Sequence, residues 1–182
     1  MKLFKRPALW PLIIILVLMA IPILLMGICK LFGLVITYTG SVPPGLYRIK
    51  PADKNQISQG DYIAFCLPDK IAQYGMKRGY IHQGDCTNGS QELIKEVIAL
   101  PQDHVRITEQ AIWVGKYRYT APVQKVDHAG KWLERWVKNG INQPHGYWVY
   151  GVGSPEYSWD SRYYGSINFN NIRHKMVPVW LF

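Results

Sequence analysis

The sequence predicts a mainly β domain that follows one N-terminal membrane-spanning helix. An uncharged apolar segment lies close to the N-terminus, and short segments rich in β-forming residues follow it, the first of them bounded by Gly60 and Pro68. Beyond the apolar segment, the 182-residue chain is long enough for one domain with a packed core and too short for two.

The apolar segment covers residues 8–29, ALWPLIIILVLMAIPILLMGIC, and contains no charged residue. At 1.5 Å of rise per residue, about 20 helical residues cross the ~30 Å hydrocarbon layer of a bilayer. Three basic residues precede the segment and only Lys30 follows it closely. The positive-inside rule therefore predicts a cytoplasmic N-terminus at residues 1–7 and an exported domain at residues 30–182. A cleaved signal peptide is the alternative, but the stretch is long for one and no A-x-A-like site follows it.

Two of the three cysteines lie in the part of the chain that is predicted to be exported. Cys66 and Cys86 are 20 residues apart, and such a pair is expected to form one disulfide in an oxidising compartment. Closing a loop of this length contributes about 3 kcal/mol in the chain-entropy model. Two buried free thiols are the alternative. Cys29 lies at the end of the apolar segment, where it is expected to act as a small apolar side chain.

The residues after the anchor are typical of short strands. Residues 61–67, DYIAFCL, and residues 146–151, GYWVYG, are rich in β-forming side chains. Residues 105–120 predict a hairpin, because apolar and polar residues alternate on either side of short polar turns. Residues 176–182, MVPVWLF, predict an edge strand, because Pro178 has no N–H to donate to a neighbouring strand.

Residues 130–138, GKWLERWVK, have two interpretations. Trp132 and Trp136 are four residues apart, which is helical spacing, so the segment could form one or two turns of an amphipathic helix. It could equally be a loop whose indole rings lie among lipid headgroups.

Composition excludes several classes of function. The formal net charge is +9, but the Lys and Arg residues are scattered and form no basic run, so no nucleic-acid partner is predicted. The five His are isolated and lack the spacing of metal ligands, and the phosphate-binding glycine motifs do not occur. The sequence therefore predicts neither a metal site nor a cofactor.

The first segment with possible chemistry is TGSVPPGLY, residues 39–47. Pro43 and Pro44 each fix φ near −65°, and Pro44-Gly45 suits the centre of a type II turn. Ser41 is therefore held on a stiff backbone, with its own N–H available as a donor. The alternative is a serine whose hydroxyl caps a turn.

The second segment is ELIKEVIALP, residues 92–101. As a strand, it is largely apolar on both faces, so that Lys95 extends from an apolar face. A helix also fits the spacing. Burial lowers the pKa of an amine, and a fall of about two units raises the neutral fraction at pH 7 about a hundredfold, as a general base requires. The alternative is a lysine whose stem covers apolar surface while its ammonium reaches water.

The third segment is SWDSRYYG, residues 158–165. In an extended stretch, Ser158, Asp160 and Arg162 would point to the same side. Asp160 would pair with Arg162, and Ser158 would orient a lysine amine. The alternative is a polar turn with a surface ion pair that contributes less than about 1 kcal/mol.

Together, and in this order behind an N-terminal anchor, the three segments resemble the type I signal peptidases, most closely the conjugative transfer signal peptidase TraF family. The S-x-P-x-G-L-Y motif of that family is similar to residues 41–47. Its L-[LI]-K-x-V-x-A-x-x-G-D motif is similar to residues 93–103, and its S-x-D-S-R-Y-[FY]-G motif to residues 158–165. The resemblance also includes GYIHQGDCTNG, residues 79–89, and extends from the anchor to about Gly165.

The sequence departs from the family pattern at three places. Pro44 stands where many relatives have another residue, and Gln102 replaces the usual glycine before Asp103. The G-D-N run of general signal peptidases is missing, and the chain reads GVGSPEYS at residues 151–158 instead. This last difference favours a dedicated precursor.

The resemblance implies a coiled, mainly antiparallel β-structure with a shallow apolar cleft, and a serine endopeptidase that uses a Ser/Lys dyad. Neutral Lys95 takes the proton of Ser41, and the serine oxygen attacks the carbonyl after the small residue of an A-x-A-like cleavage site. The backbone N–H of Ser41 helps to hold the oxyanion. Four further residues are expected to support the dyad: Ser158, Asp160, Ser161 and Arg162.

The resemblance also implies the partners and the location. The partner is an exported precursor, such as a conjugative pilin, that loses its leader at the periplasmic face of the bacterial inner membrane, where lipid and components of a conjugation or type IV secretion apparatus are neighbours. Water resolves the acyl-enzyme, or, in some relatives, the substrate's own N-terminal amine does so and gives a cyclic pilin. A general type I signal peptidase and a non-catalytic anchored component of a secretion or conjugation apparatus remain as alternatives.

Overall fold

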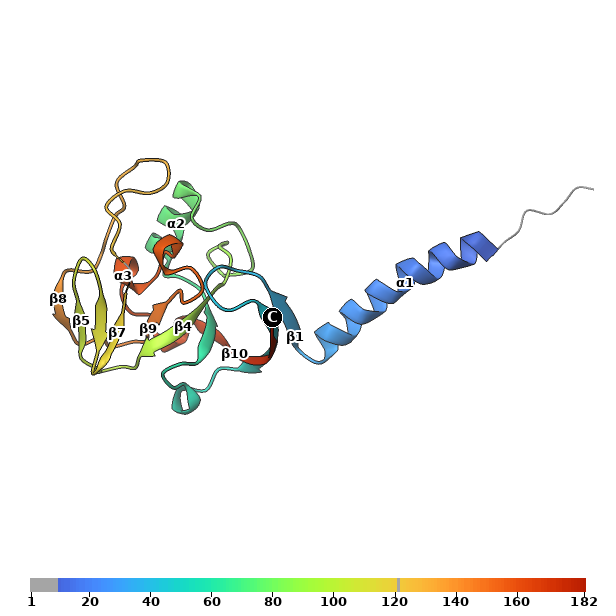
Figure 1. Ribbon diagram of the computed structural model, residues 1–182, viewed down its shortest axis with the longest axis horizontal. Coiled ribbons are helices and arrows are strands. Elements are labelled where there is room, and N and C mark those ends of the chain that lie inside the picture. The colour runs from blue at the N-terminus through green and yellow to red at the C-terminus, as the bar shows by residue number, and fades with distance from the viewer. Residues whose placement is uncertain (1–9, 121) are drawn as a thin grey trace, which may run out of the picture.

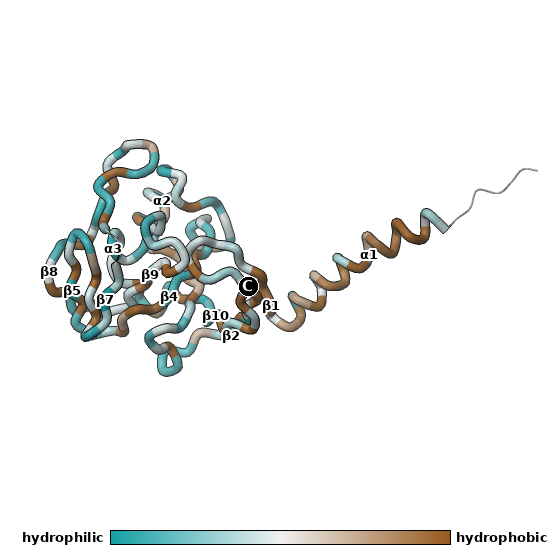
Figure 2. The backbone as a smooth tube through the Cα atoms, viewed as in Figure 1, coloured by the Kyte–Doolittle hydropathy of each residue, from teal (hydrophilic) through white to brown (hydrophobic). Residues whose placement is uncertain are grey.

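The computed structural model describes residues 10–120 and 122–182. Helix α1 (Trp10–Leu31) is the first described element, and it projects away from the rest of the chain (Figure 1). Its stretch Ile13–Leu31 is long and apolar enough to cross a membrane and is not buried against the domain, and apolar residues dominate its length (Figure 2). The predicted apolar segment thus forms one helix, apart from residues 8 and 9, which lie outside the described residues.

A six-stranded antiparallel sheet forms the centre of the domain, with strand order β1-β2-β10-β3-β4-β9. Its strands are β1 (Leu34–Thr37), β2 (Gly45–Pro51), β3 (Tyr62–Phe65), β4 (Leu93–Ala99), β9 (Trp148–Tyr150) and β10 (Ile172–Leu181). Because β1 starts directly after α1, this edge of the sheet lies at the base of the helix (Figure 1).

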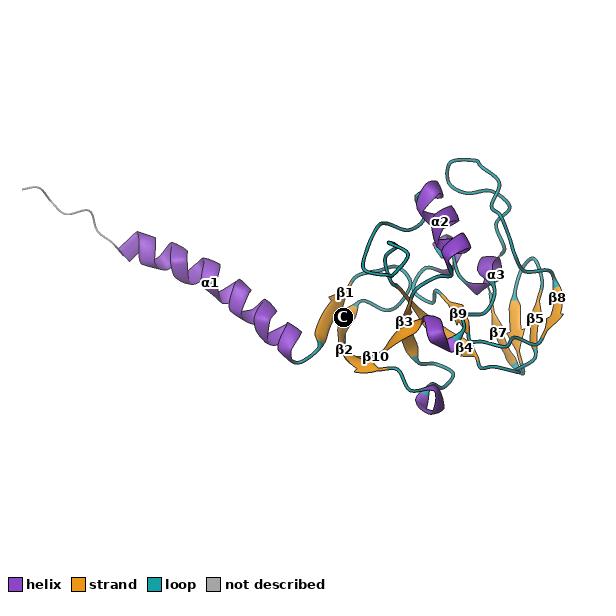
Figure 3. Ribbon diagram, turned by 180° about the vertical axis from the view of Figure 1, so that it is seen from behind, coloured by secondary structure: helices purple, strands orange, loops and turns teal. Residues whose placement is uncertain are grey.

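A second, four-stranded antiparallel sheet lies at the end of the domain away from α1 (Figure 3). Its order is β7-β6-β5-β8, with β5 (Val105–Ile107), β6 (Ile112–Val114), β7 (Tyr117–Tyr119) and β8 (Gly140–Asn142). The remaining elements are short: α2 (Asp69–Arg78), α3 (Ser161–Tyr164) and the 3-10 turns η1 (Lys54–Gln56), η2 (Pro155–Tyr157) and η3 (Phe169–Asn171). The predicted mainly antiparallel β fold behind one apolar helix is thus confirmed.

Most of the predicted strands are present, but residues 105–120 contain one strand more than predicted. The segments at residues 61–67, 92–101 and 146–151 form β3, β4 and β9, so the helical interpretation of the second is wrong. Residues 105–120 form three strands and not a single hairpin. Gly115, with φ 56°, provides a second tight turn between β6 and β7.

The predicted edge strand at residues 176–182 is confirmed from Val177 onward, but β10 (Ile172–Leu181) is longer than predicted and its first half is not at an edge. β10 begins at Ile172 and lies between β2 and β3, but its pairing with β3 ends at Met176. Pro178 lies beyond that point, where β10 has only β2 as a neighbour, and the register shifts between Pro178 and Trp180. The missing proline N–H is tolerated because this half of the strand has a single partner.

Residues 130–138 form no helix, so the helical interpretation of this segment is wrong. Trp132 is 73% exposed. Trp136 instead packs edge-on against Tyr74, with ring centroids 5.2 Å apart, and joins the largest hydrophobic cluster. The two tryptophans therefore have different environments in spite of their helical spacing.

Strand β4 contributes to all three hydrophobic clusters of the core. Val97 belongs to the first cluster, Ile98 and Ala99 belong to the second, and Ile94 packs against the third. A register shift between Val97 and Ala99 accompanies this arrangement. β4 is therefore apolar on both faces, as predicted, and Lys95 lies in its middle with only 4% of its surface exposed.

The Cys66–Cys86 disulfide is formed, so the free-thiol alternative is wrong. It joins the residue after β3 to the loop that precedes β4. Cys29 is a free thiol in α1. The disulfide thus fastens the loop before β4 to the central sheet.

Candidate active site

Three polar side chains from distant parts of the sequence meet at β4. Ser41 lies in the turn between β1 and β2, and Lys95 lies in β4. Lys95 Nζ is 2.6 Å from Ser41 Oγ and 2.6 Å from Ser158 Oγ. The three predicted residues therefore form one continuous hydrogen-bonded row.

The turn that carries Ser41 is fixed by its neighbours. The Tyr47 hydroxyl donates to the Pro43 carbonyl at 2.7 Å, and the Phe182 N–H donates to the Pro44 carbonyl at 3.0 Å. Among the described residues, the Ser41 N–H has no acceptor, so it is available to a ligand. These bonds hold the turn in place, and it presents both the hydroxyl and the N–H of its serine.

The predicted type II turn at Pro44-Gly45 is wrong. Gly45 begins β2 and does not have the positive φ that this turn type requires. Glycine is required at position 45 for another reason, because a Cβ there would lie 2.5 Å from the Trp180 carbonyl oxygen. The missing side chain lets β10 approach the turn closely.

Burial determines the protonation of Lys95. It lowers the pKa of Lys95 to about 8, while the negative charge of Asp160 acts to raise this pKa and the positive charge of Arg162 acts to lower it. At a pKa of about 8, about one-tenth of the amines are neutral at pH 7, against about 0.04% for an ordinary lysine. The amine can therefore accept a proton near neutral pH.

Asp160 and Arg162 form a buried ion pair behind Ser158, so the surface-pair alternative is wrong. Arg162 Nε lies 2.8 Å from Asp160 Oδ1, and Arg162 Nη2 donates to the Ser158 carbonyl at 2.9 Å. The segment is not extended throughout, because Asp160 caps α3 and accepts the Arg162 N–H. The helical turn brings the two side chains together and fixes the backbone of Ser158.

Ser161 contacts neither Ser41 nor Lys95. Its hydroxyl accepts the Val149 N–H at 2.8 Å, and Asp160 Oδ2 accepts the Gly151 N–H at 3.2 Å. Both bonds connect α3 to β9 and the residue that follows it. Because β9 pairs with β4, they hold Ser158 beside Lys95.

Two glycines that the sequence did not identify as site residues lie against the dyad. A Cβ on Gly151 would collide with Ser158 Oγ and would lie 3.3 Å from Lys95 Nζ. A Cβ on Gly153 would lie 2.7 Å from the Gly40 carbonyl oxygen. The G-V-G run at residues 151–153 was the only sequence pattern that could have pointed to these two glycines, and such a run does not indicate which residues pack against it.

A groove of about 880 Å³ is lined by both Ser41 and Lys95. Its walls come from the residues before Ser41, the segment after α2, the start of β4, a hairpin at residues 125–133, and η2 with the residues around it. The groove is large enough for several residues of an extended peptide.

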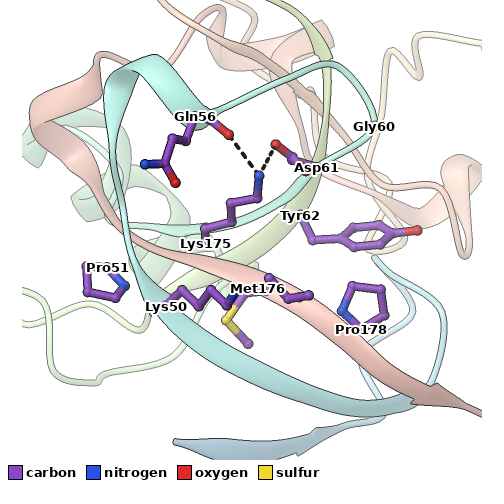
Figure 4. A pocket seen from close by; sticks show the side chains of 10 residues that line it. Lys50, Pro51, Gln56, Gly60, Asp61, Tyr62, Lys175, Met176 and Pro178 are labelled. Atoms are coloured by element: carbon purple, nitrogen blue, oxygen red, sulfur yellow. Dashed lines mark hydrogen bonds and ion pairs between the residues drawn. The ribbon is translucent and has the colours of Figure 1, made fainter.

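A second cavity, of about 430 Å³, lies beside β10 and contains neither dyad residue. Lys175 points into it, pairs with Asp61 at 2.7 Å and donates to the Gln56 carbonyl at 2.8 Å (Figure 4). Lys175 and Asp61 neutralise each other there, whereas the groove at Ser41 holds the Ser41–Lys95 contact, so that groove is the candidate site. Across residues 10–120 and 122–182, no three metal-ligating side chains gather in one place.

The family model described as "Signal peptidase, peptidase S26" matches residues 8–181. The plasmid transfer protein TraF of Escherichia coli is 30% identical over 150 residues, which cover 81% of this chain and 82% of that protein. The conjugal transfer protein TraF of Agrobacterium tumefaciens (strain 15955) is 31% identical over 151 residues, 82% of this chain and 84% of that protein. The crystal structure of a signal peptidase I from Enterococcus faecalis V583 is similar at a TM-score of 0.37 and 17% identity, over 66% of this chain and 96% of that one. The chain belongs to the signal peptidase family, peptidase S26.

Proposed function

We propose that this chain is a membrane-anchored serine endopeptidase that removes the leader from an exported precursor, a conjugative pilin, with Ser41 as nucleophile and Lys95 as general base. The observation that carries the proposal is the 2.6 Å contact between Lys95 Nζ and Ser41 Oγ, made by a buried amine whose pKa is lowered to about 8. A serine within reach of a base that is neutral near physiological pH is the arrangement that nucleophilic catalysis requires.

The reaction follows from these contacts. Neutral Lys95 accepts the Ser41 proton while Oγ attacks the scissile carbonyl carbon, and the Ser41 N–H donates to the oxyanion. The Lys95 ammonium then gives its proton to the departing amine, which leaves an ester on Ser41. Lys95 next activates the water that hydrolyses this ester. Ser158 accepts one N–H of the amine and so directs its lone pair toward Ser41.

The position of the site relative to α1 supports cleavage at a membrane surface. Ser41 follows the end of α1 by ten residues. Exposed aromatic residues lie close to the start of the domain, where Tyr38 follows β1. The ring centroids of Tyr38 and Phe182 are 5.7 Å apart, and those of Phe182 and Trp180 are 5.4 Å apart. Aromatic rings are favourable at the bilayer interface. In the proposed arrangement, the domain lies on the outer face of the bilayer, where a precursor still anchored by its leader presents its cleavage site.

The relatives favour a conjugation precursor, since proteins named for plasmid and conjugal transfer match most of the chain. The proposed cleavage follows a small residue, as in an A-x-A-like site. The acyl-enzyme has two possible acceptors: water gives a linear product, and the precursor's own N-terminal amine gives a cyclic one. Two alternatives remain. The chain could be a general signal peptidase that cleaves many precursors, or a component of the transfer apparatus that has no catalytic activity.

The test uses the full chain in nanodiscs, a candidate pilin precursor, and the Ser41→Ala and Lys95→Ala variants. The proposal predicts cleavage by the wild type alone, with product masses that identify the cleaved bond, and a product lighter by one further water if cyclisation occurs. Equal cleavage by all three proteins would refute the dyad. Comparable cleavage of a broad panel of unrelated precursors would instead identify a general signal peptidase.

A further inference from the structure

A hairpin at residues 125–133, in the part of the chain between the second and third motif segments, forms part of the groove wall. Val126 and Trp132 form an antiparallel bridge, and the Leu133 N–H donates to the Lys125 carbonyl at 2.9 Å. This hairpin is in the long loop that rises at the top of the domain beside α2 (Figure 1). It is therefore a small structured element beside the proposed active site.

The end of α2 fixes the position of the hairpin. Asp127 accepts hydrogen bonds from Arg78 Nη2 at 2.5 Å and from the Tyr80 hydroxyl at 2.7 Å. Arg78 Nη2 also donates to the Trp132 carbonyl at 3.0 Å, on the other side of the hairpin. The hydrogen bond from Tyr80 is the largest of several that keep the pKa of Asp127 well below its usual range. The carboxylate therefore stays charged, and hydrogen bonds from Arg78 hold both strands of the hairpin against the end of α2.

The tip of the hairpin contacts two walls of the groove. Asp127 bonds to Tyr80, which lines the wall after α2. The next residue, His128, stacks on Tyr157 of η2, with ring centroids 5.3 Å apart and an interplanar angle of 26°. η2 ends one residue before Ser158. The hairpin thus connects the wall after α2 with the wall that leads to the dyad.

Two large apolar side chains of the hairpin are exposed. Val126 is 44% exposed and lines the groove, and Trp132 is 73% exposed. As cross-strand neighbours in one bridge, the two side chains lie on the same face of the hairpin. Val126 lines the same groove as Ser41, so a peptide bound there with its scissile carbonyl at Ser41 is expected to contact Val126. Trp132 does not itself line the groove but lies beside Val126 as its bridge partner.

We propose that the 125–133 hairpin is a specificity-determining wall, on which Val126 and Trp132 bind apolar residues of the precursor close to its cleavage site. The inference rests on the proposed function, and it adds a contact that lies outside the three motif segments. The occupant is an apolar segment because the exposed pair offers no hydrogen-bonding group except the indole N–H of Trp132. The pinned hairpin presents the pair at little cost in ordering.

The kinetic test compares Trp132→Ala and Val126→Ser with a matched control, Tyr117→Ala. Tyr117 is an exposed aromatic residue of β7 that, unlike Trp132, has no cross-strand partner among the residues that line the groove. We expect KM for the precursor to rise about tenfold in the Trp132 variant, which is a typical loss for an interface tryptophan. kcat should stay within about twofold, and the control should match the wild type in both constants.

A crosslinking test is independent of turnover. A photoreactive phenylalanine analogue is placed at position 132 or at position 117 in a Ser41→Ala background, and the precursor is added before illumination. We expect a covalent adduct from position 132 and none from position 117. Cleavage by the wild type, with no adduct from position 132 and an unchanged KM in the Trp132→Ala variant, would overturn the role of the hairpin while the proposed function stands. Failure of the wild type to cleave would overturn the proposed function, and this inference with it.

Discussion

The amine of Lys95 lies 2.6 Å from the hydroxyl of Ser41, although 54 residues separate them in the chain. The central sheet produces this contact, because β4 carries Lys95 while the turn before β2 carries Ser41. Apolar residues on both faces of β4 bury the amine, and that burial is the main cause of its lowered pKa. The packing of the core and the proposed chemistry thus depend on the same strand.

Ser158 is expected to orient Lys95 without touching the precursor's reacting atoms. Removing its hydroxyl in Ser158→Ala leaves the amine with Ser41 as its remaining hydrogen-bond partner. We expect kcat to fall about 10- to 100-fold with KM nearly unchanged, because a misdirected general base loses transition-state stabilisation only. Steady-state kinetics check this, and Ser158→Thr, which keeps a hydroxyl, should retain more activity than Ser158→Ala. Equal losses in both variants would contradict an orienting role.

The buried Asp160–Arg162 pair is expected to matter first for stability. Arg162→Met leaves the carboxylate of Asp160 buried without its main partner, and breaking such a pair costs about 3–5 kcal/mol. Chemical denaturation measures this loss. The double variant Asp160→Asn/Arg162→Met should be less destabilised than the sum of the two single changes. Strict additivity would show that the two side chains act separately.

Gln102 occupies the position where the family pattern has glycine, and its φ is 73°. A left-handed conformation is strained for a residue with a Cβ, so Gln102→Gly should raise the free energy of unfolding by roughly 1 kcal/mol. Thermal unfolding of the domain provides the measurement, with Gln59→Gly as a control at an exposed loop residue without positive φ. A fall in stability on Gln102→Gly would show that the side chain makes a contact worth more than the strain.

The exposed aromatic residues beside α1 are expected to lie in the bilayer interface. In nanodiscs that contain brominated lipid, the fluorescence of Trp180 should be quenched, because its exposed ring contacts Phe182, which in turn contacts Tyr38 just after β1. The difference between the wild type and Trp180→Phe isolates this signal from Trp10 in α1. An equal degree of quenching in both proteins would place Trp180 away from lipid and would contradict the proposed position of the domain.

The resemblance of the three segments, taken together, to a known family predicted the row of Ser41, Lys95 and Ser158, whereas each segment alone left an ordinary structural alternative open. The sequence could not show why certain other positions must be glycine, because the reason is a contact with a distant part of the chain. Gly45 and Gly151 are required by the approach of Trp180 and Ser158, which are distant in the sequence, and a lone glycine does not reveal its neighbour.

Strand neighbours were equally hidden from the sequence. The apolar pattern of β10 identifies a strand but not its place between β2 and β3, since pairing is a property of the assembled sheet. The hairpin at residues 125–133 depends on the bonds from Arg78 and Tyr80 to Asp127, and no local pattern connects these residues. The helical spacing of Trp132 and Trp136 was misleading for the same reason: tertiary contacts determined each ring's environment.

The pH dependence of kcat/KM tests the Ser41–Lys95 assignment most directly. Only the neutral amine can accept a proton, so the rate should rise with pH through a pKa of about 8 and level off above it, well below the ordinary lysine value of about 10.4. The measurement follows precursor cleavage by the full chain in nanodiscs from pH 6 to pH 10. A rising limb with a midpoint near pH 8 is the result expected for Lys95 as the general base. A flat profile across this range would contradict it.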